Sequence, residues 1–505
     1  MSEPTPSVEE LQETIKALRA QIDDLTEQLA SLNQWTYGKR SEQIHSQQLP
    51  LDDEDVSVFF CPEHTGNQSD QAATAAKVPE QKKAKATRKE VLSKDIQTIE
   101  TVIPCDENQC PKGHELTSVG KRLVRTELIV IPRRVFKQEI YEETKKCLEC
   151  AKETGDEAFV SGHAPRPLIA HSLGSASMVA TVAYNKYCLY VPLWRQKNEF
   201  KRDGINLPET TYANWMIKAA EVVKPVVDLI HQHLMSQQFL QGDETPFKAL
   251  RDPRKPKPGT HGEMWVVRTI ASNPEPAVYY QYDATRSGAF AKQLYESFEG
   301  VLQCDGYSGY NALKSPIKRV GCMAHVRRKF FKAAKNFTSG VPVQALGLID
   351  AMFVLERQVQ HATAAKRKAF RAEHIAPLMA KFWQLIDGLT TLPKGGLGRA
   401  VQYAQNQAEY LNRLLEYGEV DFSNNATERS VKSFVMGRKN FLFSTSVAGA
   451  QANAAMMTLC ESAKANGLDV FEYFKALFER VPQVPEFQQN EDTLSAFLPW
   501  NIKLD

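Results

Sequence analysis

The stretch from residue 239 to residue 305 constrains the fold more than any other part of the sequence. Its apolar runs predict three strands, then a helix, then a fourth strand, in the order 239–243, 263–270, 277–282, 287–298 and 300–305. Asp243 closes the first strand, shortly before Pro246, and Asp305 closes the fourth. Because the ends of buried strands aim side chains at a shared edge of the sheet, we expect these two carboxylates to converge.

A third acidic residue, Glu428, lies far downstream of the other two. Asn424 and Asn425 are good N-cap residues before a helix-competent stretch, which places Glu428 in the first turn of a helix that can face the sheet edge. Strand order and acid placement together are those of a ribonuclease-H-like core. Each acid alone is explained as well by a turn or a capping box, but the three together, with basic residues around them, favour a catalytic site.

Several phrases occur in a fixed order over nearly the whole chain. The main ones are Asp243-Glu-Thr-Pro246, Val301-Leu-Gln-Cys-Asp305-Gly-Tyr-Ser-Gly-Tyr-Asn311, Gly321-Cys-Met-Ala-His-Val-Arg-Arg-Lys-Phe330, Asn424-Asn-Ala-Thr-Glu-Arg429 and Gly437-Arg-Lys-Asn-Phe441. Others are Trp35-Thr-Tyr-Gly-Lys-Arg-Ser-Glu42, Leu189-Tyr-Val-Pro-Leu-Trp-Arg-Gln-Lys-Asn198 and Ala463-Lys-Ala-Asn-Gly-Leu468. On these phrases the chain resembles the DDE transposases of the bacterial insertion sequence sixty-six family.

The resemblance implies metal-dependent cleavage at the ends of an insertion sequence, followed by strand transfer into target DNA. Asp243, Asp305 and Glu428 would then be the catalytic residues and the ligands of magnesium (Mg²⁺, or Mn²⁺). Double-stranded DNA, as element ends and as target, would be the partner, with possible accessory proteins of the element. Two other classes stay open: a metal-dependent nuclease of the same fold that does not join DNA, and a non-catalytic DNA-binding regulator.

Contact with DNA has to be argued from local charge, because the formal net charge is only +2. Residues 314–335 contain eight Lys or Arg and no Asp or Glu, and a second basic group follows Glu428. A solvated helical face is the alternative, but unrelieved positive charge favours a phosphate partner. The residues predicted to bind DNA are His325, Arg327, Arg328, Lys329, Arg429, Lys432, Arg438 and Lys439.

The N-terminal residues 1–40 predict a leucine-zipper coiled coil. Its apolar residues alternate spacings of three and four, at Val8, Leu11, Ile15, Leu18, Ile22, Leu25, Leu29 and Leu32. β-branched residues at most a positions and Leu at every d position favour a parallel homodimer, or a higher oligomer, over an amphipathic helix packed on its own domain. Residues 41–95 lack periodicity and predict a disordered linker.

A small zinc-finger-like domain is predicted at 96–160. Cys147 and Cys150 have the spacing of a zinc knuckle, and Cys105 with Cys110 could complete a four-cysteine site. The resemblance also implies a zinc finger, although the family usually has two residues between the first pair of cysteines. Three alternatives stay open here: a widened spacing, His114 in place of a cysteine, or a degenerate site without metal.

The remaining residues divide between helical segments and the core. Residues 161–235 predict helices with a break at 203–208, which is the outline of a DNA-binding helix-turn-helix or of an ordinary helical hairpin. His231 and His233 are predicted to be structural. The core is predicted at 236–339 and 418–450, interrupted by a helical insertion at 340–417 and followed by a C-terminal helical region at 451–505.

Composition agrees with a multidomain protein of mixed α and β structure. The chain has 505 residues, of which 42% are hydrophobic and 24% charged, enough for more than one core. No apolar run is long enough to cross a bilayer, and the N-terminus has no apolar signal core, so we expect no membrane partner. The count of nine cysteines is odd, four lie in the predicted zinc domain and the rest are scattered, which argues against a disulfide framework and predicts a cytoplasmic, nucleoid-associated protein.

Overall fold

The computed structural model describes residues 134–147, 158–255, 261–335, 337, 339–389 and 395–504. The predicted zipper and linker lie outside these residues. So does the set of predicted zinc ligands as a whole, because Cys105, Cys110 and Cys150 are not among the described residues. Cys147 is the last residue of strand β1 (Thr144–Cys147), which pairs antiparallel with β2 (Ala158–Ser161).

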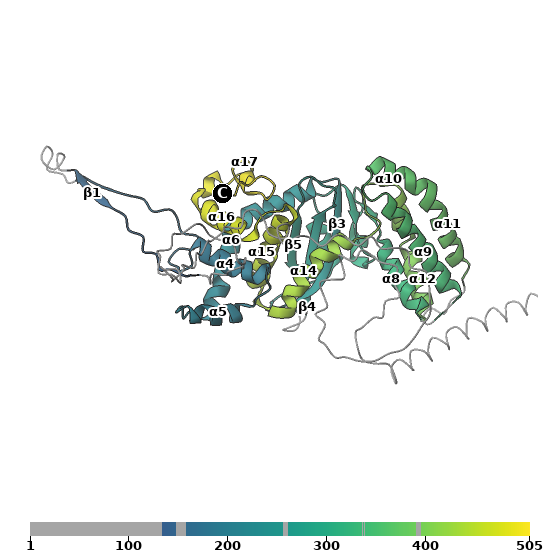
Figure 1. The fold of residues 1–505 in the computed structure, drawn as a ribbon, viewed down its shortest axis with the longest axis horizontal. Helices are drawn as coiled ribbons and strands as arrows, with labels where there is room; N and C mark the ends of the chain where they lie inside the picture. The colour runs from purple at the N-terminus through teal and green to yellow at the C-terminus, as the bar shows by residue number, and fades with distance from the viewer. Residues whose placement is uncertain are drawn as a thin grey trace, which may run out of the picture. The chain divides into compact units, whose positions relative to one another are not determined.

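A mixed six-stranded sheet lies at the centre of the described structure (Figure 1). Its strands are β3 (Phe239–Arg251), β4 (His261–Thr269), β5 (Val278–Asp283), β6 (Val301–Gln303), β7 (Lys318–Val320) and β8 (Ser444–Ser446). The order across the sheet is β5-β4-β3-β6-β7, and β8 pairs with β3. β3, β4 and β5 are antiparallel, whereas β6 and β7 join in parallel. The predicted succession of three strands, a helix and a strand is therefore confirmed, with α7 (Gly288–Leu294) as the helix.

Both faces of the sheet are covered. On one face Trp265 packs against Phe290 of α7 and against Tyr310 of the short helix η1 (Ser308–Ala312). On the other face Phe247 and Tyr280 pack against Phe434 of α14 (Asn425–Phe441). Burial on two sides explains why β4 is apolar almost without alternation, since neither face meets water.

The sequence prediction was wrong about where the first and fourth strands end. β3 continues through Pro246 to Arg251, so Asp243 lies inside the strand, and β6 ends at Gln303, two residues before Asp305. The Pro246 carbonyl accepts from Arg438, on the side of β3 opposite to β4. The backbone N–H and C=O of one strand residue point to the same side, so the N–H that proline lacks would not have bonded to β4. Proline is tolerated at this position for that reason.

One group of helices comes from the parts of the chain that precede and follow the sheet. Its helices are α4 (Ala176–Tyr187), α5 (Leu193–Arg202), α6 (Glu209–Met235), α15 (Val447–Ala465), α16 (Val470–Arg480) and α17 (Glu491–Leu494). The predicted break at 203–208 falls between α5 and α6. Trp215 and Ile230 bury α6 in the main core, and a helix-turn-helix function for this pair stays a prediction. His231 and His233 each donate from Nε2 to a backbone carbonyl, of Leu294 and Glu275, the structural role expected for them.

A second group of helices packs together beyond β7 (Figure 1). It comprises α8 (Met323–Ala334), α9 (Val341–Gln358), α10 (Ala364–Phe370), the π-helical turn η2 (Arg371–Ile375), α11 (Ala376–Asp387), α12 (Gly396–Asn406) and α13 (Ala408–Asn412). Phe330, Ile349 and Phe382 form its core together with Val301 and Val320 of the sheet. The elements from α9 to α13 lie within the helical insertion predicted at 340–417. Among the described helices, none is both long and apolar enough to span a membrane.

Candidate active site

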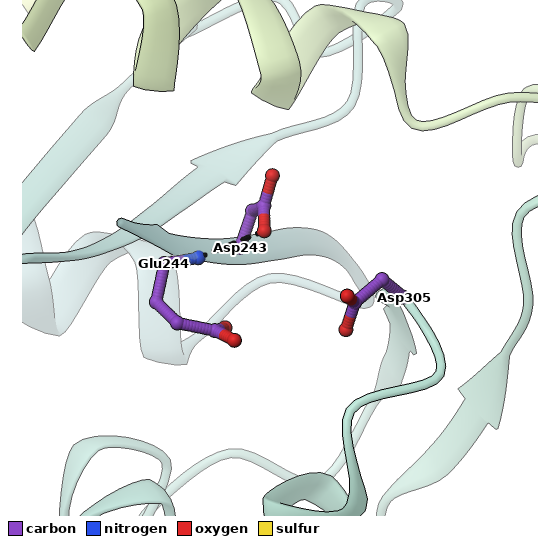
Figure 2. Close-up of side chains that lie close together, drawn as sticks. All are labelled: Asp243, Glu244 and Asp305. Atoms are coloured by element: carbon purple, nitrogen blue, oxygen red, sulfur yellow. Dashed lines mark hydrogen bonds between the residues drawn. The ribbon is translucent and has the colours of Figure 1, made fainter. Parts of the chain in front are cut away.

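Three carboxylates gather at the centre of the sheet (Figure 2). Carboxylate oxygens of Asp243, Glu244 and Asp305 all lie within 4.8 Å of one another. Asp243 and Glu244 are neighbours on β3, and Asp305 comes from the loop after β6. Oxygen ligands clustered in this way suit a hard divalent cation such as Mg²⁺ or Mn²⁺.

Strand register explains why Asp243 and Asp305 meet. In the parallel pair of β3 and β6, Gln241 is opposite Gln303, and each Asp lies two residues beyond its Gln. The side chains of the two glutamines are joined by a hydrogen bond of 2.7 Å. Parallel neighbours in register thus deliver both carboxylates to one place, which is the convergence that the sequence predicted.

The surroundings of Asp243 disfavour its negative charge. Burial, together with the nearby charges of Glu244 and Asp305, raises the pKa of Asp243 to about 8. Its Oδ1 accepts one backbone hydrogen bond, from Glu244 N at 2.9 Å. A divalent cation would relieve this repulsion, so the residues present fit a metal ion.

The loop that carries Asp305 is held from two sides. Asp305 Oδ1 accepts from the backbone N–H of Tyr307 at 2.9 Å, a turn in which the side chain orders its own loop. Tyr403 of α12 packs directly on Gly306, where an added Cβ would come within 2.6 Å of the Tyr403 ring. The helical group therefore contacts the loop bearing the second Asp.

Glu428 lies in the first turn of α14, as predicted, but outside the 4.8 Å cluster of carboxylates. Its two oxygens accept from one guanidinium nitrogen of Arg328, at 3.2 and 3.0 Å. His325, one turn earlier on α8, places Nε2 3.6 Å from Glu428 Oε1. The negative charge of Glu428 nevertheless contributes to the raised pKa of Asp243. Glu428 therefore influences the carboxylate cluster electrostatically from outside it.

Asn424 begins α14 but does not cap it in the expected way. Its side chain makes no capping hydrogen bond and instead donates to the carbonyl of Gly242, at 3.2 Å. Gly242 directly follows Gln241, the last residue of β3 that pairs with β6, and a buried carbonyl needs a donor. Thr427 adds a hydrogen bond to Gln241, so α14 is fastened to β3 beside Asp243.

The predicted DNA-binding residues fall into different environments. On α8, Arg327 forms an ion pair with Asp350, with Nε and Oδ1 2.5 Å apart, and Lys329 Nζ lies 4.4 Å from the centre of the Tyr403 ring. The expectation of unrelieved positive charge at 314–335 was therefore wrong for Arg327 and Arg328, because their acidic partners come from distant parts of the chain.

The basic residues on α14 also differ among themselves. Arg438 is half-buried and donates to Thr245 Oγ1, at 3.1 Å, and to the Pro246 carbonyl. Arg429, Lys432 and Lys439 are exposed on the same helix. Arg438 therefore helps to fix α14 against β3. Arg429 and Lys432 lie close to Glu428 along the helix, whereas Lys439 lies in its last turn.

Glu244 is the member of the cluster that sequence reasoning did not select. It stands directly after Asp243 in the phrase Asp243-Glu-Thr-Pro246, so the signal was present. Consecutive residues on a strand face opposite sides of a sheet, however, and this argued against a shared site. The structure reconciles the two, because the longer Glu side chain reaches toward Asp305 from the other face.

Comparison with known proteins gives full-length matches. Residues 171–452, more than half of the 505, match a family described as Transposase IS66 family, residues 458–500 match IS66 C-terminal element, and residues 24–100 match Transposase C of IS166 homeodomain. Uncharacterized protein y4jD of Sinorhizobium fredii (strain NBRC 101917 / NGR234) is 26% identical over 98% of this chain and 98% of its own. Uncharacterized protein y4hP of the same strain is 29% identical over 97% and 89%.

One solved structure is similar at a low level. It is a chain of the Drosophila P element transposase strand transfer complex, with a TM-score of 0.34 and 12% sequence identity, covering 57% of this chain and 92% of that chain.

Proposed function

Because this chain belongs to the IS66 family of transposases, we propose that it is a DDE transposase that cuts DNA at the ends of an insertion sequence and joins them to target DNA. The observation that supports this most is the register of β3 and β6, which brings Asp243 and Asp305 together. Glu428 stands at the start of the helix fastened to the same strand.

Asp243 and Asp305 would hold the divalent ions, and Glu428 would complete the ligand set of one of them. When bound, the metal ions supply activation of the attacking oxygen and stabilisation of the departing 3′ oxygen of DNA. Glu428 is paired with Arg328 in the structure, so acting as a ligand requires it to exchange that partner. No covalent intermediate with the protein is needed, and no Ser or Tyr nucleophile is proposed.

The basic residues around the site would hold the DNA backbone in register while one bond is attacked. Arg429, Lys432 and Lys439, which are exposed on α14, would bind phosphates, and His325 lies beside Glu428. Arg328 would pass from Glu428 to a phosphate when the site is occupied. Dimerisation through residues 1–40, zinc binding and accessory proteins remain predictions about parts of the chain or partners outside the described structure.

The test is cleavage and joining of a labelled duplex that carries the ends flanking this gene, with Mg²⁺ or Mn²⁺. We expect wild type and Glu299→Gln, an exposed acid outside the cluster, to form joined product. Asp305→Asn should lose cleavage while DNA binding is kept. Cleavage that persists in Asp305→Asn would overturn the assignment of the active site.

The remaining outcomes distinguish the alternatives. Cleavage without joining by wild type would favour a nuclease of the same core. DNA binding with neither reaction, in the presence of either metal, would favour a regulator. Glu428→Gln then tests the third acid separately, because loss of joined product in this variant would assign Glu428 to the same reaction.

A further inference from the structure

Glu244 is the most enclosed of the three clustered carboxylates. Its side chain has no exposed surface. Oε1 accepts from Arg286 Nε at 2.8 Å and from a second Arg286 nitrogen, and Oε2 accepts from the Tyr310 hydroxyl at 2.7 Å. Both oxygens therefore already have strong donors, one of them charged.

The strand register places Glu244 on a different face from Asp243. Glu244 is opposite Trp265 on β4, and Trp265 packs against α7 and η1. Asp243 is opposite Val266, on the face that α14 covers. Glu244 thus approaches the site from the layer that contains Arg286 and Tyr310, where a buried charge needs its partner.

A continuous set of contacts leads from Glu244 to Asp305. The Arg286 guanidinium lies 3.9 Å from the centre of the Tyr307 ring, a close stacking contact. The Tyr307 hydroxyl donates to the Arg286 carbonyl, which ties the same two residues a second time. The backbone N–H of Tyr307 donates to Asp305 Oδ1. Arg286, fixed by Glu244, therefore fixes the residue that orients Asp305.

We propose that Glu244 is a positioning residue, which orients Asp305 through Arg286 and Tyr307 and is not itself a metal ligand. The proposal rests on the proposed function in one respect, namely that Asp243 and Asp305 bind a divalent cation. It assigns the clustered acids two different tasks. Asp243 and Asp305 would bind the cation, whereas the charge of Glu244 is compensated by Arg286.

The experiment measures Mn²⁺ affinity by calorimetry in the full-length protein without DNA. The variants are Glu244→Gln, Tyr307→Ala and the double variant, with Tyr307→Phe as the conservative control. Gln keeps an acceptor oxygen for Arg286 and turns its NH2 group toward the Tyr310 hydroxyl, which can accept. Tyr307 is partly exposed, so circular dichroism should show each variant folded. Tyr307→Ala changes no charge, which separates positioning from simple electrostatic attraction of the cation.

A positioning role predicts that Glu244→Gln and Tyr307→Ala each weaken Mn²⁺ binding by about tenfold. The double variant should be no weaker than the stronger single effect, because both changes break one path. Tyr307→Phe keeps the stacked ring and should bind Mn²⁺ close to the wild-type affinity.

Two results would overturn the proposal. One is wild-type affinity in Tyr307→Ala with weakened binding in Glu244→Gln, which would make Glu244 a ligand. The other is a double variant weakened by the product of the two single effects. Asp243→Asn distinguishes failure of the metal site itself: if this variant binds Mn²⁺ as wild type does, the proposed active site and the positioning role both fall.

Discussion

Arg328 and Glu428 form an ion pair in which one guanidinium nitrogen donates to both carboxylate oxygens. The pair joins α8 to the first turn of α14 across 100 residues of sequence. It compensates the charge of the third acid while that acid lies outside the cluster formed by Asp243, Glu244 and Asp305. A cation that recruits Glu428 has to compete with Arg328.

Removing this competitor should strengthen metal binding. We expect Arg328→Gln to raise the affinity for Mn²⁺, measured without DNA, by about two- to fivefold, because half-exposed ion pairs contribute no more than about 1 kcal/mol. Lys332→Gln is the matched control, since it removes the same charge from an exposed position of α8. Unchanged or weaker binding in Arg328→Gln, relative to Lys332→Gln, would argue that Glu428 does not join the metal site.

The structure predicts that two of the basic residues selected from sequence differ in role. Lys439→Gln should weaken DNA binding for all sequences and reduce the slope of log affinity against log salt by about 1, as expected for one lost phosphate contact. Arg327→Gln should leave that slope unchanged and lower the free energy of unfolding by about 1 kcal/mol, because Asp350 loses its partner. Salt titrations of DNA binding, with urea denaturation of both variants, check this. The reverse pattern would place Arg327 at the DNA.

The close approach of Tyr403 to Gly306 makes this glycine sensitive to substitution. An added Cβ would lie 2.6 Å from a ring carbon of Tyr403, so Gly306→Ala should cost about 1–3 kcal/mol in the free energy of unfolding. Gly347→Ala is the control, because nothing lies within 4 Å of its Cβ position and helix α9 should gain up to about 1 kcal/mol. Equal effects of the two substitutions in urea denaturation would contradict the packing of α12 on the Asp305 loop.

Lys186 gives the folded protein a dependence on pH that is unrelated to the carboxylates. This lysine is buried in α4 and donates to Asn453 Oδ1 at 2.8 Å, and burial lowers its pKa to about 7. Below that pH the folded protein bears the full cost of a buried charge. From there up to the ordinary pKa of 10.5, the unfolded chain holds a proton that the folded protein has lost, so stability rises with pH.

Substitution of Lys186 isolates this effect from other titrating groups. Lys186→Met should be more stable than wild type near about pH 6, and this advantage should shrink by at least about 1 kcal/mol near about pH 9.5. The Tyr187 hydroxyl donates to the same Asn453 oxygen, at 2.9 Å, and should keep that oxygen satisfied in the variant. Urea denaturation at both pH values gives the two differences. A constant difference would mean that Lys186 keeps its ordinary pKa.

The sequence alone was sufficient for the order of strands and for the convergence of Asp243 and Asp305. Apolar runs, Pro246 and the pair of asparagines before Glu428 are local signals, and they predicted β3 to β6 with α7 between and the start of α14. The sequence underestimated the length of β3, because the effect of Pro246 on a strand depends on the tertiary fold around it. Proline is a strand breaker unless its nitrogen faces an unpaired edge, and that edge is formed by the tertiary fold.

Only the tertiary structure decided how the charges around the site are shared. Arg327, Arg328 and Glu244 each stand beside like charges in the sequence, so pattern alone predicted a bare basic face and no role for Glu244. Their partners, Asp350, Glu428 and Arg286, lie 23, 100 and 42 residues away. Short-range patterns determine which elements form, whereas ion pairs over such separations exist only once those elements pack together.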